Sequence, residues 1–118
     1  MVQLSSKNEY LIVAVYGDMD HHSADEIKTR VDREYRTQNY KNIVFDLENV
    51  EFMDSAGIGV IVGRYKNVAP AGGKVFAVNI SEGIDRILEL SGMKKIITCE
   101  ETLEAAVSAS LGRGGING

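Results

Sequence analysis

The sequence is poor in several features that would tie it to a particular environment. It contains one cysteine, one proline and no tryptophan, and 13 Lys and Arg residues stand against 17 Asp and Glu residues, for a net charge of −4. A single cysteine, Cys99, cannot form an internal disulfide, which suits a reducing compartment. The acidic balance excludes the basic stripe that neutralises phosphates in nucleic-acid-binding proteins.

Long apolar runs are missing as well. No stretch approaches the ~20 apolar residues of a membrane-spanning helix, and nothing near the N-terminus resembles a signal peptide. We therefore expect a cytoplasmic protein that contacts neither membrane nor nucleic acid directly. With 118 residues, 44% of them hydrophobic, the chain can bury the core of one domain without a disulfide or a structural metal.

Strands and helices alternate along the chain. Alternating or continuous apolar residues predict strands, and apolar residues three and four apart predict helices. In the helix expected over residues 23–37, Ser23 and Glu26 have the spacing of a capping box. The strands are expected at residues 2–4, 10–16, 43–47, 74–78 and 96–97, and the other helices at about 55–69, 81–91 and 103–111.

This order predicts an α/β fold with a mixed, mostly parallel sheet of about five strands and about four helices. The N-terminal hairpin strand is the antiparallel one. We expect one domain over residues 1–111 and a flexible tail over 112–118. The carboxyl ends of parallel strands meet at one edge of a sheet, so the loop containing Asp20, His21 and His22 should lie beside the Asp54–Ser55 junction.

Residues 52–60 hold the candidate site, between a predicted buried strand and a predicted helix. A serine at such a junction lies beside backbone N–H groups that have no partner within the helix. Ser55 is therefore expected to cap the helix, and the same position suits a phosphate group. In the helix, Ile58, Ile61, Val62 and Tyr65 are expected to face the core, and the opposite stripe is small and mostly uncharged: Ala56, Gly59, Val60, Gly63 and Asn67.

Three segments, residues 17–24, 52–60 and 63–66, together resemble the STAS-domain anti-sigma factor antagonists, in particular those of sporulating bacilli. The order of strands and helices agrees with that family along essentially the whole chain. One departure is Ala56, where relatives often have a second serine, so Ser55 is the only acceptor in the motif.

The resemblance implies a switch between binding partners. The unphosphorylated protein would bind an anti-sigma factor that is also a serine kinase, with its bound ATP or ADP, and so free the sigma factor. That kinase would phosphorylate Ser55 and end the binding, and a serine phosphatase would reverse it. The protein itself would be a monomer when free, without catalysis, metal or cofactor. The partner surface is expected at Asp20, Asp54, Ala56, Gly57, Gly59, Val60 and Gly63.

Other interpretations of the same residues remain open. Ser55 could be the nucleophile of a small serine hydrolase with His21 or His22 as base, although Met53 replaces the first glycine of the G-x-S-x-G pattern. Asp18, Asp20 and the two histidines could bind a metal, but no distant ligands support them. Gly59 and Gly63 could pack against a neighbouring helix, and Asp20 could simply shape its loop. Arg64 and Lys66 are expected on a solvated face, and Cys99 as a small apolar filler.

Overall fold

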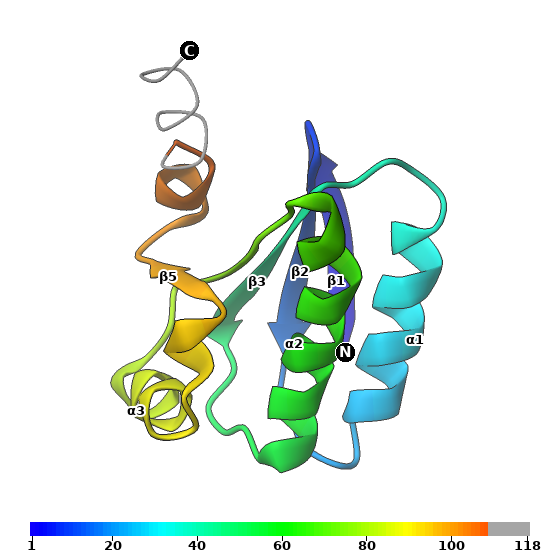
Figure 1. The fold of residues 1–118 in the computed structure, drawn as a ribbon. Helices are drawn as coiled ribbons and strands as arrows, with labels where there is room; N and C mark the ends of the chain where they lie inside the picture. Colours follow the sequence, from blue (N-terminus) through cyan, green and yellow to red (C-terminus); the bar gives the residue numbers. More distant parts are fainter. Residues whose placement is uncertain (109–118) are drawn as a thin grey trace.

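The computed structural model describes residues 1–108, and its core is one five-stranded sheet with the strand order β1-β2-β3-β4-β5 (Figure 1). β1 pairs with β2 in antiparallel fashion, and every other neighbouring pair is parallel. The predicted mixed α/β sheet is therefore confirmed. The strands are β1 (Val2–Lys7), β2 (Tyr10–Tyr16), β3 (Asn42–Asn49), β4 (Val75–Val78) and β5 (Thr98–Glu100).

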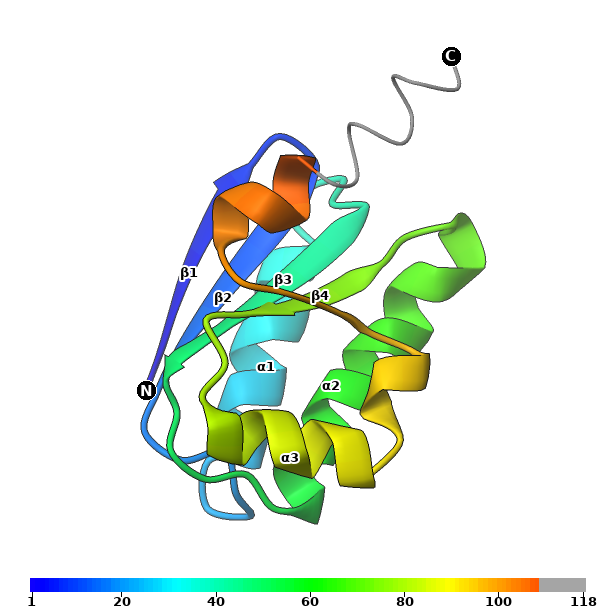
Figure 2. The same ribbon diagram turned by 90° about the vertical axis from the view of Figure 1, so that its left-hand side faces the viewer.

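Three helices follow the parallel strands: α1 (Ala24–Tyr35), α2 (Ser55–Val68) and α3 (Glu82–Leu90). They cover one face of the sheet, whereas the helical residues 103–108 lie on the other face (Figure 2). Two separate clusters of buried apolar residues reflect this arrangement, a large one under α1, α2 and α3 and a smaller one under residues 103–107. None of the helices within residues 1–108 is long and apolar enough to cross a membrane.

The last strand differs from the sequence-based expectation, and the last helix is tested only in part. The last strand spans Thr98–Glu100 instead of residues 96–97, because a 3₁₀ turn, Met93–Lys95, follows α3 and its closing hydrogen bonds reach Ile96 and Ile97. The expected final helix is present over residues 103–108. Its predicted continuation to residue 111, and the predicted tail at 112–118, lie outside the described residues.

The expected capping box at the start of α1 is wrong. The Ser23 side chain makes no cap hydrogen bond to the helix. Its Oγ instead accepts a hydrogen bond from the Asp20 amide at 3.1 Å and donates one to the Asp18 carbonyl at 2.7 Å. Ser23 therefore stabilises the loop that precedes α1, and this loop is the one that reaches the candidate site.

Arg64 is buried, which corrects the expectation of a solvated position. Its side chain is 6% exposed and lies between α2 and α1, with Nε 3.0 Å from Oδ1 of Asp32. That distance makes an ion pair, although the angle is not that of a hydrogen bond and Nη1 has no hydrogen-bond partner among the described residues. An ion pair enclosed in this way is more sensitive to loss of one partner than a surface pair. It holds α1 against the helix that carries Ser55.

Candidate functional site

Two loops meet at the carboxyl edge of the sheet, where β2 and β3 end. Met19 and Met53 form an isolated parallel bridge. The Met19 amide donates to the Phe52 carbonyl at 3.0 Å, and the Asp54 amide donates to the Met19 carbonyl at 3.1 Å. Both methionine side chains are buried. The predicted proximity of the Asp20 loop and the Asp54–Ser55 junction is thus confirmed, and the contact is built from backbone hydrogen bonds.

The cap of α2 is Asp54, and the expectation that Ser55 caps this helix is wrong. One carboxylate oxygen of Asp54, Oδ1, accepts hydrogen bonds from the amides of Ala56 at 2.8 Å and Gly57 at 3.2 Å. Ser55 is the first helical residue and is exposed. Its hydroxyl makes no hydrogen bond to any of the described residues, so it is available to a reagent or a partner from solvent.

His21 joins the loop before α1 to the cap of α2. Its amide lies 3.3 Å from Oδ2 of Asp54, and its ring Nδ1 lies 3.5 Å from the same oxygen. The ring of His22 packs against that of His21 in a tilted arrangement, with centroids 4.0 Å apart. Asp20 accepts hydrogen bonds from the amides of His22 and Ser23. Asp20 therefore shapes the loop, and His21 fixes it to Asp54.

The hydrogen bonds around Asp54 change its titration. Partial burial favours the neutral acid, but the amides of Gly57 and Ala56, with further bonds from the His21 ring and amide, hold the pKa of Asp54 below its ordinary value. A carboxyl group of this kind stabilises the fold above its unfolded pKa of about 4, and that contribution is lost as the pH falls through the lower folded value.

We expect this linkage to appear in Asp54→Asn. Asparagine still caps a helix but carries no charge to titrate. When the pH is lowered from about 5 to about 3, the Tm of the wild type should therefore fall by more than the Tm of Asp54→Asn. Both Tm values are measured by calorimetry at several pH values. Parallel Tm curves for the two proteins over this range would show that Asp54 is not the linked group.

Some of the residues expected on the partner surface are exposed, and others are buried. Gly59 and Gly63 face open space, since a Cβ atom built at either one meets nothing within 4 Å. Ala56 is half-buried. Val60 is only 5% exposed and packs in the main core, so its placement on the outward stripe is wrong.

Gly57 is also buried, and a Cβ atom there would lie only 2.2 Å from the Met19 carbonyl oxygen. It is the close packing of the two loops that requires a glycine at this position. Gly57 therefore shapes the site from inside and offers no surface to a partner.

Phe52 is the first residue of the candidate stretch 52–60, but no role was expected for its side chain. Its ring is 50% exposed, although the next residue, Met53, is 2% exposed. The available signal was a large apolar residue next to the acidic Glu51 in the loop between β3 and α2. Strand alternation from β3 gave no reason to place it outside, because the strand ends at Asn49.

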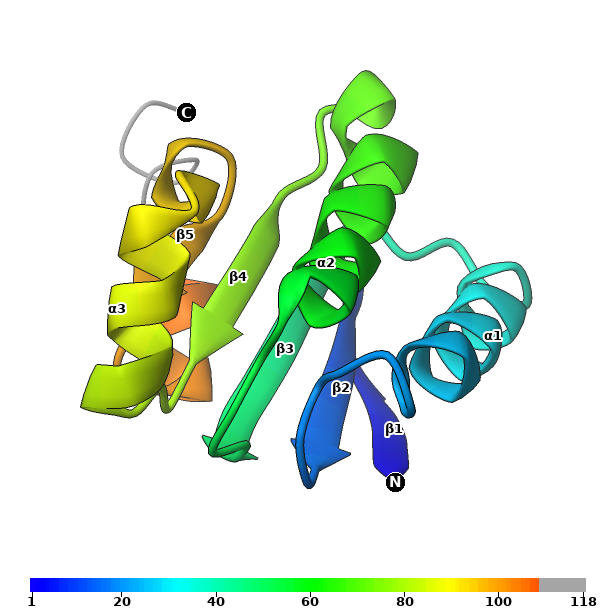
Figure 3. The same cartoon turned by 90° about the horizontal axis from the view of Figure 1, so that it is seen from below.

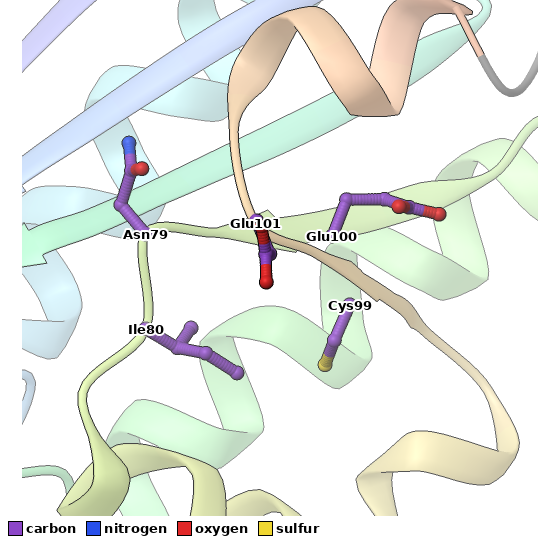
Figure 4. Close-up of a pocket in the computed structure, with 5 residues that line it drawn as sticks. All are labelled: Asn79, Ile80, Cys99, Glu100 and Glu101. Carbon is purple, nitrogen blue, oxygen red and sulfur yellow. The ribbon is translucent and has the colours of Figure 1, made fainter.

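A separate pocket of about 410 Å³ lies where β4 and β5 end, away from the Ser55 junction. Figure 4 shows its lining side chains, with Ile80 and Cys99 directed toward the same space. Burial raises the pKa of the Cys99 thiol, which makes it a weak nucleophile near neutral pH. The half-buried Cys99 also packs against the main core, in keeping with the expected role of a small filler.

This geometry gives little support to a serine hydrolase or to a metal site. The His21 ring is directed to Asp54, and no hydrogen bond joins Ser55 to a histidine among residues 1–108. Over the same residues, no group of three or more His, Cys, Asp or Glu side chains is arranged to hold a metal ion. The arrangement is that of an exposed serine hydroxyl on a rigid, acidic edge.

Comparison with known proteins gives consistent matches over almost the whole chain. The model of the STAS domain matches residues 1–106. An anti-sigma F factor antagonist of Paenibacillus polymyxa is 34% identical over 96 residues, which is 81% of this chain and 82% of the relative.

Solved structures show the same fold. The anti-sigma factor antagonist SpoIIAA in its unphosphorylated form has a TM-score of 0.81 at 24% identity, covering 95% of this chain and 97% of the other. SpoIIAA of Bacillus in the phosphorylated form has a TM-score of 0.71 at 23% identity, covering 93% of this chain and 99% of the other.

Proposed function

The chain belongs to the STAS-domain family and is related within it to the anti-sigma factor antagonists, and from this premise we propose that it is an anti-sigma factor antagonist switched by phosphorylation of Ser55. In the unphosphorylated state it binds an anti-sigma factor and frees the sigma factor. The observation that carries the proposal is the exposed Ser55 hydroxyl at the first position of α2, fixed beside the Asp20 loop. The setting in this proposal is cytoplasmic control of transcription during sporulation.

The partner in this proposal is a serine kinase with bound ATP. Its γ-phosphoryl group passes to Oγ of Ser55, ADP leaves, and the hydroxyl proton passes to a base of the kinase. Asp54 serves as the helix cap in this proposal, since its Oδ1 accepts the amides of Ala56 and Gly57. A serine phosphatase then hydrolyses the phosphoserine and restores the binding form.

The structure suggests why a phosphate would end binding without unfolding the domain. A phosphoserine adds about −1.5 to −2 charges near neutral pH. The helix dipole favours an anion there by roughly 0.3–1 kcal/mol. However, the second and third amides of α2 are already bound to Asp54, so the phosphate gains few new donors and lies beside an existing carboxylate. A partner that covers this edge would have to desolvate both charges, which is costly unless it supplies cations.

The experiment that tests this function uses a complex of the cognate anti-sigma factor and its sigma factor. Addition of the unphosphorylated chain should release the sigma factor, which gel filtration detects. A chain first incubated with the kinase and ATP should release none. Release by both forms would contradict the switch, and release by neither would contradict the antagonist function.

Gly63→Leu tests the position of the partner surface. Because the space beside Gly63 is open, leucine should fit without strain and raise helix stability by up to ~1 kcal/mol. We expect Tm to hold or rise slightly, and affinity for the anti-sigma factor to fall by tenfold or more through steric exclusion. Gly63→Ala is the matched control and should gain the stability with little loss of affinity. A lowered Tm in Gly63→Leu would place this residue in a packed interface within the domain.

A serine hydrolase remains the alternative function, and the carboxylate–imidazole contact between Asp54 and His21 is the one observation that favours it. A hydrolase would also need the imidazole to reach the serine hydroxyl. Esterase activity on an activated ester that disappears in Ser55→Ala would support it.

A further inference from the structure

The aromatic side chain of Phe52 is exposed to solvent, and its backbone is held by a hydrogen bond. Only four large hydrophobic residues are exposed within residues 1–108: Met1, Tyr16, Phe52 and Leu90. The Phe52 carbonyl accepts the Met19 amide at 3.0 Å, and the Met53 side chain anchors the following residue in the core. These contacts fix the backbone at Phe52 and leave its side chain outside the core.

Phe52 and Ser55 are both exposed and close enough in the chain for one partner to cover both. Two residues separate Phe52 from Ser55, so their Cα atoms, three chain steps apart, are at most about 11 Å from each other. A standard protein interface covers about 800 Å² on each partner, which corresponds to a disc about 16 Å in radius. A partner centred on Ser55 therefore reaches Phe52, and aromatic rings are enriched in the centres of such interfaces.

The charges around the ring indicate the kind of partner. The two loops that meet here carry four carboxylates: Asp18 and Glu51 are exposed, and Asp20 and Asp54 are half-buried. An apolar ring on loops that carry several carboxylates fits an apolar pocket bordered by basic groups. A kinase that holds ATP has such a basic surface near its nucleotide, because cations bind the phosphates.

We propose that Phe52 is the apolar anchor by which the anti-sigma factor kinase holds this chain, inserted into a pocket of the kinase while Ser55 faces the bound ATP. This inference rests on the proposed function and adds a contact to it. It makes Phe52 a binding determinant for both activities of the partner, since the same contact serves release of the sigma factor and phosphorylation of Ser55.

The test compares Phe52→Ala with two controls. Phe52→Leu keeps an apolar side chain at the same place, and Leu90→Ala removes a large side chain that is 81% exposed on α3. For each protein we measure Tm, the Kd for the cognate anti-sigma factor kinase with ADP, and kcat/KM for phosphorylation by that kinase. Phe52→Ala should weaken binding and lower kcat/KM by tenfold or more with Tm within a few degrees of wild type. Phe52→Leu should recover most of the loss, and Leu90→Ala should match wild type.

The possible outcomes distinguish failure of the Phe52 anchor from failure of the proposed function. If the wild type binds and is phosphorylated while Phe52→Ala differs from it by less than twofold, the anchor is wrong and the proposed function stands. An equal loss in Leu90→Ala would also overturn the anchor, because the effect would then be unspecific. If the wild-type chain neither binds nor accepts phosphate, the proposed function fails and the anchor fails with it.

Discussion

Ser55→Ala should bind the anti-sigma factor at close to wild-type strength and accept no phosphate at all from the kinase. The reason is that Ser55 is the only hydroxyl acceptor within residues 52–60, and its side chain makes no hydrogen bond within the described residues. The variant would release sigma factor continuously in the presence of ATP. Because Asp54 provides the cap of α2, and alanine favours a helix at least as well as serine, Tm should change little. Binding is measured by calorimetry, and transfer of phosphate is measured by mass spectrometry of the protein.

Ser55→Asp is the matched variant for the charge. One short carboxylate reproduces only part of the charge of a phosphate, so its affinity for the anti-sigma factor should fall by less than that of the phosphorylated protein. Wild-type affinity in Ser55→Asp would weaken the electrostatic account. Loss of binding by a folded Ser55→Ala protein would instead show that the hydroxyl itself is a contact.

Gly57→Ala should destabilise the domain by about 3 kcal/mol or more, which is at the upper end for added atoms in a packed site. A Cβ atom at this position would lie 2.2 Å from the Met19 carbonyl oxygen and 2.8 Å from a carbon of Met53. This carbonyl belongs to the backbone, so no side-chain rotation can move it away from the added Cβ atom. It is also held in place by a hydrogen bond from the Asp54 amide. The loop that carries Asp20 would have to separate from α2, so binding should fall together with Tm in thermal denaturation.

Gly59→Ala provides the control for Gly57→Ala. It makes the same substitution two residues later on the same helix, where a Cβ atom meets nothing within 4 Å. It should raise stability by up to ~1 kcal/mol, because alanine is the better helix former. Equal Tm values for Gly57→Ala and wild type would show that the two loops do not pack as closely as the structure has them.

Most of the fold follows from patterns that are local in the sequence. Apolar runs located four of the five strands, and their alternation with helices predicted the parallel pairing of β2 with β3 (Figure 3). This pairing brings His21 to Asp54. The fifth strand was placed two residues early, because apolar character at Ile96 and Ile97 also suits a turn that packs on the core. Composition alone does not distinguish these two uses of an apolar pair.

The helix after Ser55 was harder to predict because it is covered on more than one side. A stripe at helical spacing assumes a single buried face, whereas α2 packs on the sheet and also against α1. Val60 and Arg64, four residues apart, are buried as a result, and Arg64 is paired with Asp32. Which of two adjacent residues caps the helix was likewise open, since Asp54 and Ser55 are both good caps and only the backbone decides.

Mass spectrometry of the wild-type chain after incubation with the cognate anti-sigma factor kinase and ATP tests the central claim most directly. The account predicts one added phosphate per chain, with fragmentation placing it on Ser55 and on no other serine or threonine. Phosphate on any other residue, or an unmodified chain in the presence of an active kinase, would contradict it.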